Sequence, residues 1–143
     1  PTSTLSFNIL SDRNKDIHMI QTVLIDDDEL DNYIHKRALE NCGNVKLVRI
    51  FQDPIAATQW FETEAKGIDL ILLDINMPVM NGFEFLEKHR SLPISHQAQH
   101  VVVMLGVKLK PEEYQMLDLL NTTWQEKPIT ADFIASWISK ECS

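Results

Sequence analysis

Two kinds of segment alternate along this chain. Short, nearly unbroken apolar runs stand between longer stretches in which apolar residues recur every three or four positions. The short runs predict strands at Thr22–Ile25, Val45–Phe51, Asp69–Leu73, Val101–Leu105 and Thr122–Gln125. A run without polar alternation, such as the one that precedes Asp74, is typical of a parallel strand covered on both faces.

The periodic stretches between the runs predict helices. The first carries Leu30, Ile34 and Ala38 at i, i+4 spacing on one face and stops before Gly43. The others are predicted from Asp53-Pro54 to Gly67, from about Asn81 to Arg90, from Pro111 to about Asn121 and from Thr130 to about Lys140. Two apolar stripes are expected to face the core: Ala56, Ala57, Trp60 and Phe61 in the second helix, and Phe133, Ile134, Trp137 and Ile138 in the last.

Five strands that alternate with five helices predict a (βα)5 fold of the α/β class. Such alternation favours a doubly wound parallel sheet with helices on both faces. The 143 residues suit one domain, which we place at residues 21–143. Residues 1–20 are polar and aperiodic, so we expect a poorly ordered N-terminal arm or an extension foreign to the natural chain.

Charge and composition narrow the class of protein. The formal net charge of -8 argues against nucleic acid as a partner. No apolar run approaches the roughly 20 residues of a membrane span, and none resembles a signal peptide. Cys42 and Cys142 lie far apart in the sequence, without a metal-binding spacing, and are interpreted as free thiols of a reducing compartment. These observations predict a cytoplasmic protein with no membrane contact.

Charged residues follow several of the predicted strands. Asp26 and Asp27 follow the first, Asp74 the third and Lys127 the fifth, and in a parallel sheet these ends meet at one edge. Clustered carboxylates need a positive partner, and Mg²⁺ or Mn²⁺ is the natural one. An ionised carboxylate beside a metal and a lysine can act as a nucleophile toward phosphorus. Taken singly, the aspartates could also be a helix cap, and Lys127-Pro128 a turn.

Three segments resemble the receiver domain of two-component response regulators, the CheY-like superfamily. They are VLIDDDE at 23–29, LILLDINMPVMNG at 70–82 and EKPIT at 126–130, and the resemblance extends over residues 21–140. It implies the strand order 2-1-3-4-5. It also implies a signalling domain rather than an enzyme, with a sensor histidine kinase or a histidine phosphotransfer protein as phosphodonor and a downstream protein effector.

The resemblance assigns roles to the strand-end residues. Asp74 would be the phospho-acceptor, Asp27 a direct Mg²⁺ ligand, Asp26 a ligand through water, and Asn76 a ligand through its backbone carbonyl. Lys127 would contact the phosphoryl group or Asp74. Two structural features are implied as well: a cis peptide bond between Lys127 and Pro128, and a turn at Asn81-Gly82.

The sequence departs from the family pattern at Gly106. Receivers usually carry Ser or Thr there, whose hydroxyl binds the phosphoryl group. We hypothesise that Lys108 supplies a cation in place of that hydroxyl, and we expect Val107 to narrow access to Asp74. Trp124 stands where the family places an aromatic residue that swings inward after phosphorylation, and here it is either such a reporter or a fixed packing residue.

Two alternatives stay open at this level. Gly106 is compatible with a degenerate receiver that acts as an interaction module independent of phosphorylation. A phosphatase of the haloacid-dehalogenase type also uses an aspartate nucleophile with Mg²⁺, but it would leave the segment INMPVMNG at 75–82 unexplained.

Overall fold

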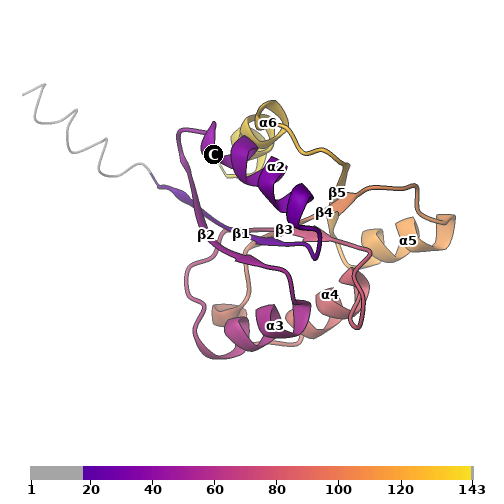
Figure 1. Cartoon of the computed structure of the whole chain (residues 1–143). Coiled ribbons are helices and arrows are strands. Elements are labelled where there is room, and N and C mark those ends of the chain that lie inside the picture. The colour runs from indigo at the N-terminus through magenta and orange to yellow at the C-terminus, as the bar shows by residue number, and fades with distance from the viewer. Residues whose placement is uncertain (1–17, 143) are drawn as a thin grey trace, which may run out of the picture.

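The structure, a computed structural model, describes residues 18–142. The predicted arm at residues 1–20 therefore lies almost wholly outside the described residues. The elements are, in chain order, β1 (Ile20–Ile25), α2 (Glu29–Glu40), β2 (Val45–Phe51), α3 (Pro54–Thr63), β3 (Leu70–Asp74), α4 (Gly82–Arg90), the short 3₁₀ turn η1 (Ile94–His96), β4 (His100–Leu105), α5 (Pro111–Leu119), β5 (Thr123–Glu126) and α6 (Ala131–Glu141) (Figure 1).

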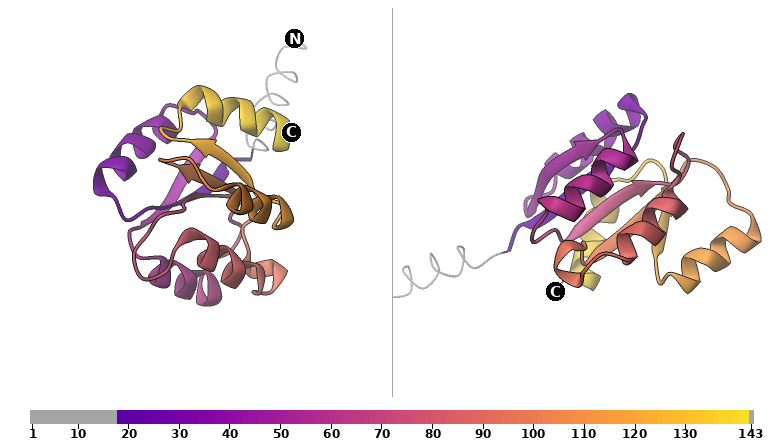
Figure 2. Two further views of the ribbon diagram at one scale, coloured as in Figure 1. Left: turned by 90° about the vertical axis from the view of Figure 1, so that its right-hand side faces the viewer. Right: turned by 90° about the horizontal axis from the view of Figure 1, so that it is seen from below.

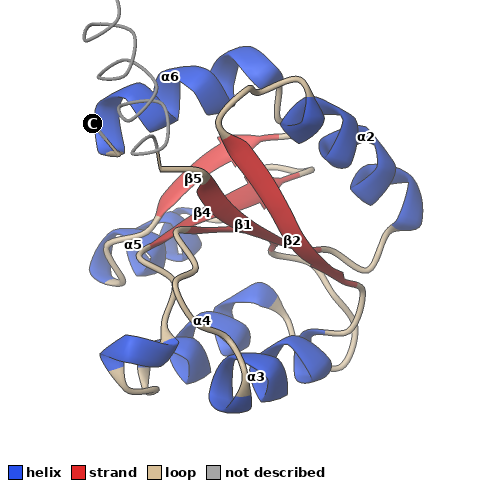
Figure 3. Cartoon of the chain, turned by 90° about the vertical axis from the view of Figure 1, so that its left-hand side faces the viewer, coloured by secondary structure: helices blue, strands red, loops and turns tan. Residues whose placement is uncertain are grey.

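The five strands form one parallel sheet (Figure 3), in the order β2-β1-β3-β4-β5 (Figure 1). This confirms both the predicted (βα)5 architecture and the implied strand order. The central strand β3 pairs with β1 on one side and with β4 on the other. Each crossover returns the chain to the edge of the sheet where the preceding strand began. All five strands therefore end at the opposite edge, which carries the site.

Helices cover both faces of the sheet, with α2 and α6 on one face and α3, α4 and α5 on the other (Figure 2). Successive strand residues point to opposite faces, so β3 contributes Ile71 and Leu73 to one core cluster and Leu70 and Leu72 to the other. All five residues of β3 are buried. The apolar run of its first four residues suits this central position, and Asp74 is the one polar residue of the strand.

The buried face of α2 differs from the prediction. Leu30 and Ile34, expected on its core side, are 65% and 40% exposed. The buried residues are Asn32, His35 and Leu39. The two polar side chains are buried because each bonds the backbone of another segment. Asn32 Nδ2 donates to the carbonyl of Asp26, and His35 Nε2 accepts from the N–H of Ile129, in the segment between β5 and α6.

The bounds of four strands, β1, β3, β4 and β5, differ from the predicted ones by one or two residues. Strand β1 begins at Ile20, two residues early, because Ile20 pairs with Val45 of β2 and its N–H donates to the carbonyl of Asn44. The connection between α4 and β4, for which the sequence predicts neither helix nor strand, contains the short turn η1. Within residues 18–142, none of the helices is both long enough and apolar enough to cross a bilayer.

We expect His89 to make the fold sensitive to acid. Its imidazole is 2% exposed between the rings of Phe61 and Phe85, and its Nε2 accepts the N–H of Ala98. Burial, and then the charge of Arg90, lowers the pKa of His89 from 6.5 to about 4. The neutral ring is the form that the fold favours, so this stabilisation is present above pH 6.5 and is lost as the pH falls toward about 4.

The free energy of unfolding from urea titrations should therefore fall by roughly 2 to 3 kcal/mol through this group between pH 7 and pH 4. His89→Gln keeps an acceptor for the Ala98 N–H and removes the titration, so its pH profile should be flatter. Parallel profiles for the parent and the variant would contradict this assignment.

Candidate functional site

Three aspartates and one lysine meet at the carboxyl edge of the sheet. Asp26 and Asp27 follow β1 directly, Asp74 is the last residue of β3, and Lys127 follows β5. One carboxylate oxygen from each aspartate lies within 4.8 Å of the others. The structure thus brings together the strand-end residues that the sequence singles out.

Lys127 contacts two of these aspartates and a further one, Asp31, from α2. Its Nζ lies 2.9 Å from Asp26 Oδ2, 2.8 Å from Asp31 Oδ2 and 3.2 Å from Asp74 Oδ1. An ammonium group has three donors, and here each of them has a carboxylate partner. Its backbone is fixed as well, because the N–H of Lys127 donates to the carbonyl of Leu105 at 2.7 Å. The Lys127–Pro128 peptide bond is cis, as the resemblance implied.

Burial and charge set the protonation behaviour of the site. Asp74 is 5% exposed, and burial together with the charge of Asp26 raises its pKa from 3.8 to about 6, against the opposing effect of Lys127. The backbone N–H of Asn76 also bonds this carboxylate and lowers the pKa. Burial alone would lower the pKa of Lys127, but its bonds to Asp31 and Asp26 and the charge of Asp74 raise it above its usual value.

The donor set fits a hard divalent cation. Asp26 is fully buried and Asp74 nearly so, whereas Asp27 is exposed at the mouth of a hollow of about 550 Å³ that all three line. Asn76 lines the same hollow. Oxygen ligands only, two of them charged and fixed by folding, suit Mg²⁺ or Mn²⁺ rather than Zn²⁺. The direct role of Asp27 and the carbonyl role of Asn76 stay predictions.

Gly82 lets the start of α4 approach the end of β3. A Cβ on Gly82 would lie 2.7 Å from the backbone oxygen of Asp74 and 2.8 Å from Cα of Ile75. The N–H of Gly82 donates to the carbonyl of Ile75 at 2.9 Å, and Asn81 caps the helix with a reciprocal bond pair to Glu84. Glycine is therefore required beside the acceptor strand for steric reasons.

Gly82→Ala should lower the free energy of unfolding by about 1–3 kcal/mol, because the helix or the strand end must shift to admit the methyl group. Urea denaturation measures this change. Gly43→Ala is the matched control, since nothing lies within 4 Å of its added Cβ. Equal stability of the two variants would show that the contact at Gly82 is relaxed.

Gly106 sits at the end of β4, where its missing side chain leaves space. A Cβ there would meet only Cδ of Lys127, at an ordinary 3.7 Å, and its φ lies outside the left-handed region. A second hollow of about 190 Å³ adjoins the acidic one and shares Gly106, Val107 and Lys127 with it. The backbone and the space thus accept a side chain that the sequence does not provide.

The remaining residues of interest surround this space. Val107 is 63% exposed and lines both hollows, one of them together with Asp74. Its effect on access to Asp74 stays a prediction. Lys108 lines the second hollow and, within the described residues, makes no hydrogen bond or ion pair. Trp124 is 39% exposed and packs on Tyr114 of α5, with ring centroids 5.0 Å apart. Whether Trp124 moves on phosphorylation stays a prediction.

The sequence did not indicate three residues that contact the site. Asp31 bonds Lys127, Asn32 bonds the backbone of Asp26, and His35 bonds the backbone of the segment that follows Lys127. In the sequence these three are polar residues of a helix that also has an apolar stripe. In the structure Asn32 and His35 lie on the buried side of that helix, and the apolar residues Leu30 and Ile34 are exposed. That pattern becomes visible only when the facing segment is known.

A parallel 2-1-3-4-5 sheet with a buried aspartate, two neighbouring aspartates and a lysine at its carboxyl edge defines a receiver-type signalling domain. The family model for the response regulator receiver domain matches residues 22–135. The chain belongs to the response regulator receiver domain family. Receiver domains act in two-component signalling through kinases and effectors, and this membership sets the chain apart from the haloacid-dehalogenase type of phosphatase.

Relatives share the receiver region. The cyclic di-GMP phosphodiesterase response regulator RpfG of Xanthomonas campestris pv. campestris (strain 8004) is 31% identical over 110 residues, 77% of this chain and 28% of that protein. The two-component response regulator ORR41 of Oryza sativa subsp. japonica is 30% identical over 77 residues, 54% of this chain and 61% of that protein. This chain thus covers less than two thirds of either relative.

Solved structures support the fold. A two component response regulator from Cytophaga hutchinsonii has a TM-score of 0.73 at 22% identity, covering 86% of this chain and 97% of that one. The chemotaxis protein CheY4 of Vibrio cholerae has a TM-score of 0.65 at 21% identity, covering 85% of this chain and 98% of that one.

Proposed function

We propose that this receiver domain accepts a phosphoryl group on Asp74 and signals through protein partners. The observation that supports the proposal best is the position of Lys127, whose ammonium lies 3.2 Å from the buried Asp74 carboxylate. A sensor histidine kinase or a histidine phosphotransfer protein would supply the phosphoryl group, and a downstream protein effector would read the result.

The chemistry is a displacement at phosphorus. An oxygen of ionised Asp74 forms the new P–O bond while the bond to the leaving group breaks, and the leaving group keeps the electron pair. No general base is needed, because the nucleophile carries no proton when ionised. Lys127 holds a phosphoryl oxygen and balances the charge that develops on it.

Asp26, Asp27, Asp74 and the backbone carbonyl of Asn76 would hold Mg²⁺. When bound, the cation neutralises charge on the transferring group. Asp26 keeps a fixed orientation because its Oδ1 also accepts the N–H of Asp28 at 2.9 Å. The protein's own residues thus orient the acceptor carboxylate and its neighbours before a phosphodonor arrives.

Intact-mass analysis after incubation with Mg²⁺ and acetyl phosphate tests the proposal. We expect the parent to gain one phosphoryl group and Asp74→Asn to gain none. Asp69→Asn is the matched control. Asp69 is also buried, but it lies just before the first residue of β3, at the end of the strand away from the site, where its carboxylate accepts the N–H of Gln21. An adduct that survives Asp74→Asn, or none from either acetyl phosphate or a phosphorylated histidine kinase, would contradict the proposal.

The degenerate alternative finds no support beyond Gly106. A module freed from phosphate chemistry has no need of a buried carboxylate with a pKa raised to about 6 beside two other aspartates. Such an arrangement costs folding free energy, which a binding role for the site explains.

A further inference from the structure

We infer that α2 positions Lys127 for the reaction at Asp74 through two side chains, Asp31 and His35, which act as positioning residues and not as catalytic ones. The inference rests on the proposed function, since it concerns how reactive the site is. Both residues lie within α2, and neither belongs to the strand-end residues to which the proposed function assigns a role.

Asp31 holds the end of the Lys127 side chain. Its Oδ2 lies 2.8 Å from Nζ, nearer than the 3.2 Å that separates Nζ from Asp74 Oδ1. The other partner, Asp26, belongs to the sheet edge and is fixed by its own backbone contacts. Asp31 is therefore the residue through which α2, among the described residues, holds the ammonium of Lys127.

His35 holds the backbone just beyond Lys127. Its imidazole is 1% exposed, and its Nε2 accepts the N–H of Ile129 at 3.1 Å. A ring nitrogen that accepts carries no proton. Burial, and then the nearby charge of Lys127, lowers the pKa of His35, which keeps the ring in its accepting form.

The spacing of the two residues matches these two anchor points. Asp31 and His35 are four positions apart on α2, so they lie on one face, one turn above each other. One holds Nζ of Lys127 and the other holds the backbone two residues later. Asn32, between them, bonds the carbonyl of Asp26 at 2.7 Å. The same helix thus fixes the lysine relative to a neighbour of the acceptor.

A lysine side chain is long and flexible, and a displacement of about 1 Å in a reacting group can cost up to about 100-fold in rate. We therefore expect His35→Leu to slow phosphoryl uptake from acetyl phosphate by about 10-fold or more. His35→Gln keeps an acceptor at the reach of Nε2 and should retain most of the rate. Asp31→Asn removes the charge of one of the three carboxylate partners of Nζ, the one on α2, and should also slow uptake.

A matched control is available in α4. His89 is also buried, and its Nε2 also accepts a backbone N–H, that of Ala98 at 3.0 Å. Its ring and hydrogen-bond partners within residues 18–142 are Phe61, Phe85 and Ala98, which are not site residues. His89→Leu therefore loses the same kind of bond without touching Lys127, and its uptake rate should equal that of the parent. Thermal unfolding of each variant establishes that it is folded at the assay temperature.

A double-mutant cycle with Lys127→Ala decides whether His35 acts through the lysine. If it does, His35→Leu adds nothing in the Lys127→Ala background. An equal slowing in both backgrounds, or equal effects of His35→Leu and His89→Leu, would overturn the inference.

If the parent takes no phosphate, the proposed function fails, and the inference is judged by the NMR signal of the Lys127 ammonium. That signal should move or broaden in His35→Leu and stay in place in His89→Leu. An unmoved signal in both variants would overturn the inference independently of the phosphorylation result.

Discussion

Lys127→Ala is expected to lower the free energy of unfolding of the metal-free protein by about 3–5 kcal/mol, the usual cost of leaving a buried charge without its partner. Lys127 balances three carboxylates, of which Asp26 is fully buried and Asp74 is 5% exposed. Without the ammonium, the pKa of Asp74 should rise further above about 6, since Lys127 is a group that lowers it.

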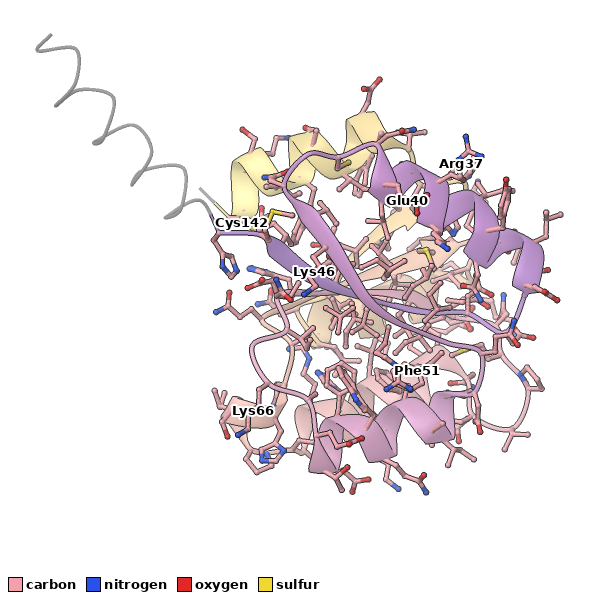
Figure 4. The ribbon with its side chains drawn as sticks, turned by 60° about the vertical axis from the view of Figure 1, so that its left-hand side comes forward. Arg37, Glu40, Lys46, Phe51, Lys66 and Cys142 are labelled. Carbon is pink, nitrogen blue, oxygen red and sulfur yellow. The ribbon has the colours of Figure 1, made fainter. Side chains whose placement is uncertain are left out.

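Urea titrations with and without Mg²⁺ measure this effect. The deficit should shrink when Mg²⁺ is added, because a ligand that binds only the folded state stabilises it. It should also shrink as the pH falls and the carboxylates become protonated. Lys46→Ala, which removes an exposed lysine from β2 (Figure 4), should change stability by less than about 0.5 kcal/mol. A metal-free Lys127→Ala protein as stable as the parent would show that the acidic cluster carries less charge than the geometry implies.

The fold was predictable because its signals are local. Strand β3 reads as buried on both faces from its sequence alone, and Asn81 and Thr130 each occupy the N-cap position of their helix. The convergence of Asp26, Asp74 and Lys127 followed from one rule, that parallel strands end at one edge. Neither inference required knowledge of side-chain contacts.

The face of α2 was not predictable in this way. Leu30 and Ile34 have the spacing of a core stripe, yet Asn32 and His35 are the buried residues. Their burial depends on partners in segments far along the chain, such as the N–H of Ile129. A hydrophobic pattern shows which side chains prefer to leave water for an apolar interior. It cannot indicate that a buried amide or imidazole has a specific backbone partner.

Gly106→Thr is expected to raise the ratio of phosphorylated to unmodified protein by about 10- to 150-fold at limiting acetyl phosphate, the equivalent of one charge-assisted hydrogen bond of about 1.5–3 kcal/mol. The backbone admits a Cβ at this position, which would meet only Cδ of Lys127, at 3.7 Å, and Gly106 lines the two adjoining hollows. Intact-mass analysis measures the ratio. Gly106→Val has nearly the same shape without the hydroxyl, so it separates the hydrogen bond from the filling of space.

Lys108→Ala then decides what replaces the hydroxyl in the parent. Lys108 lines the hollow beside Gly106 and, within the described residues, has no ion-pair partner, so its ammonium is free to reach a phosphoryl oxygen. If it does so, Lys108→Ala lowers the phosphorylated fraction of the parent and has little effect once Gly106→Thr is present. The same fractional loss in both backgrounds would mean that Lys108 acts on the charge of the surface as a whole. No loss in the parent would mean that Lys127 and the bound cation hold the phosphoryl group without help from the residues that follow β4. A receiver could then function without a side chain at position 106.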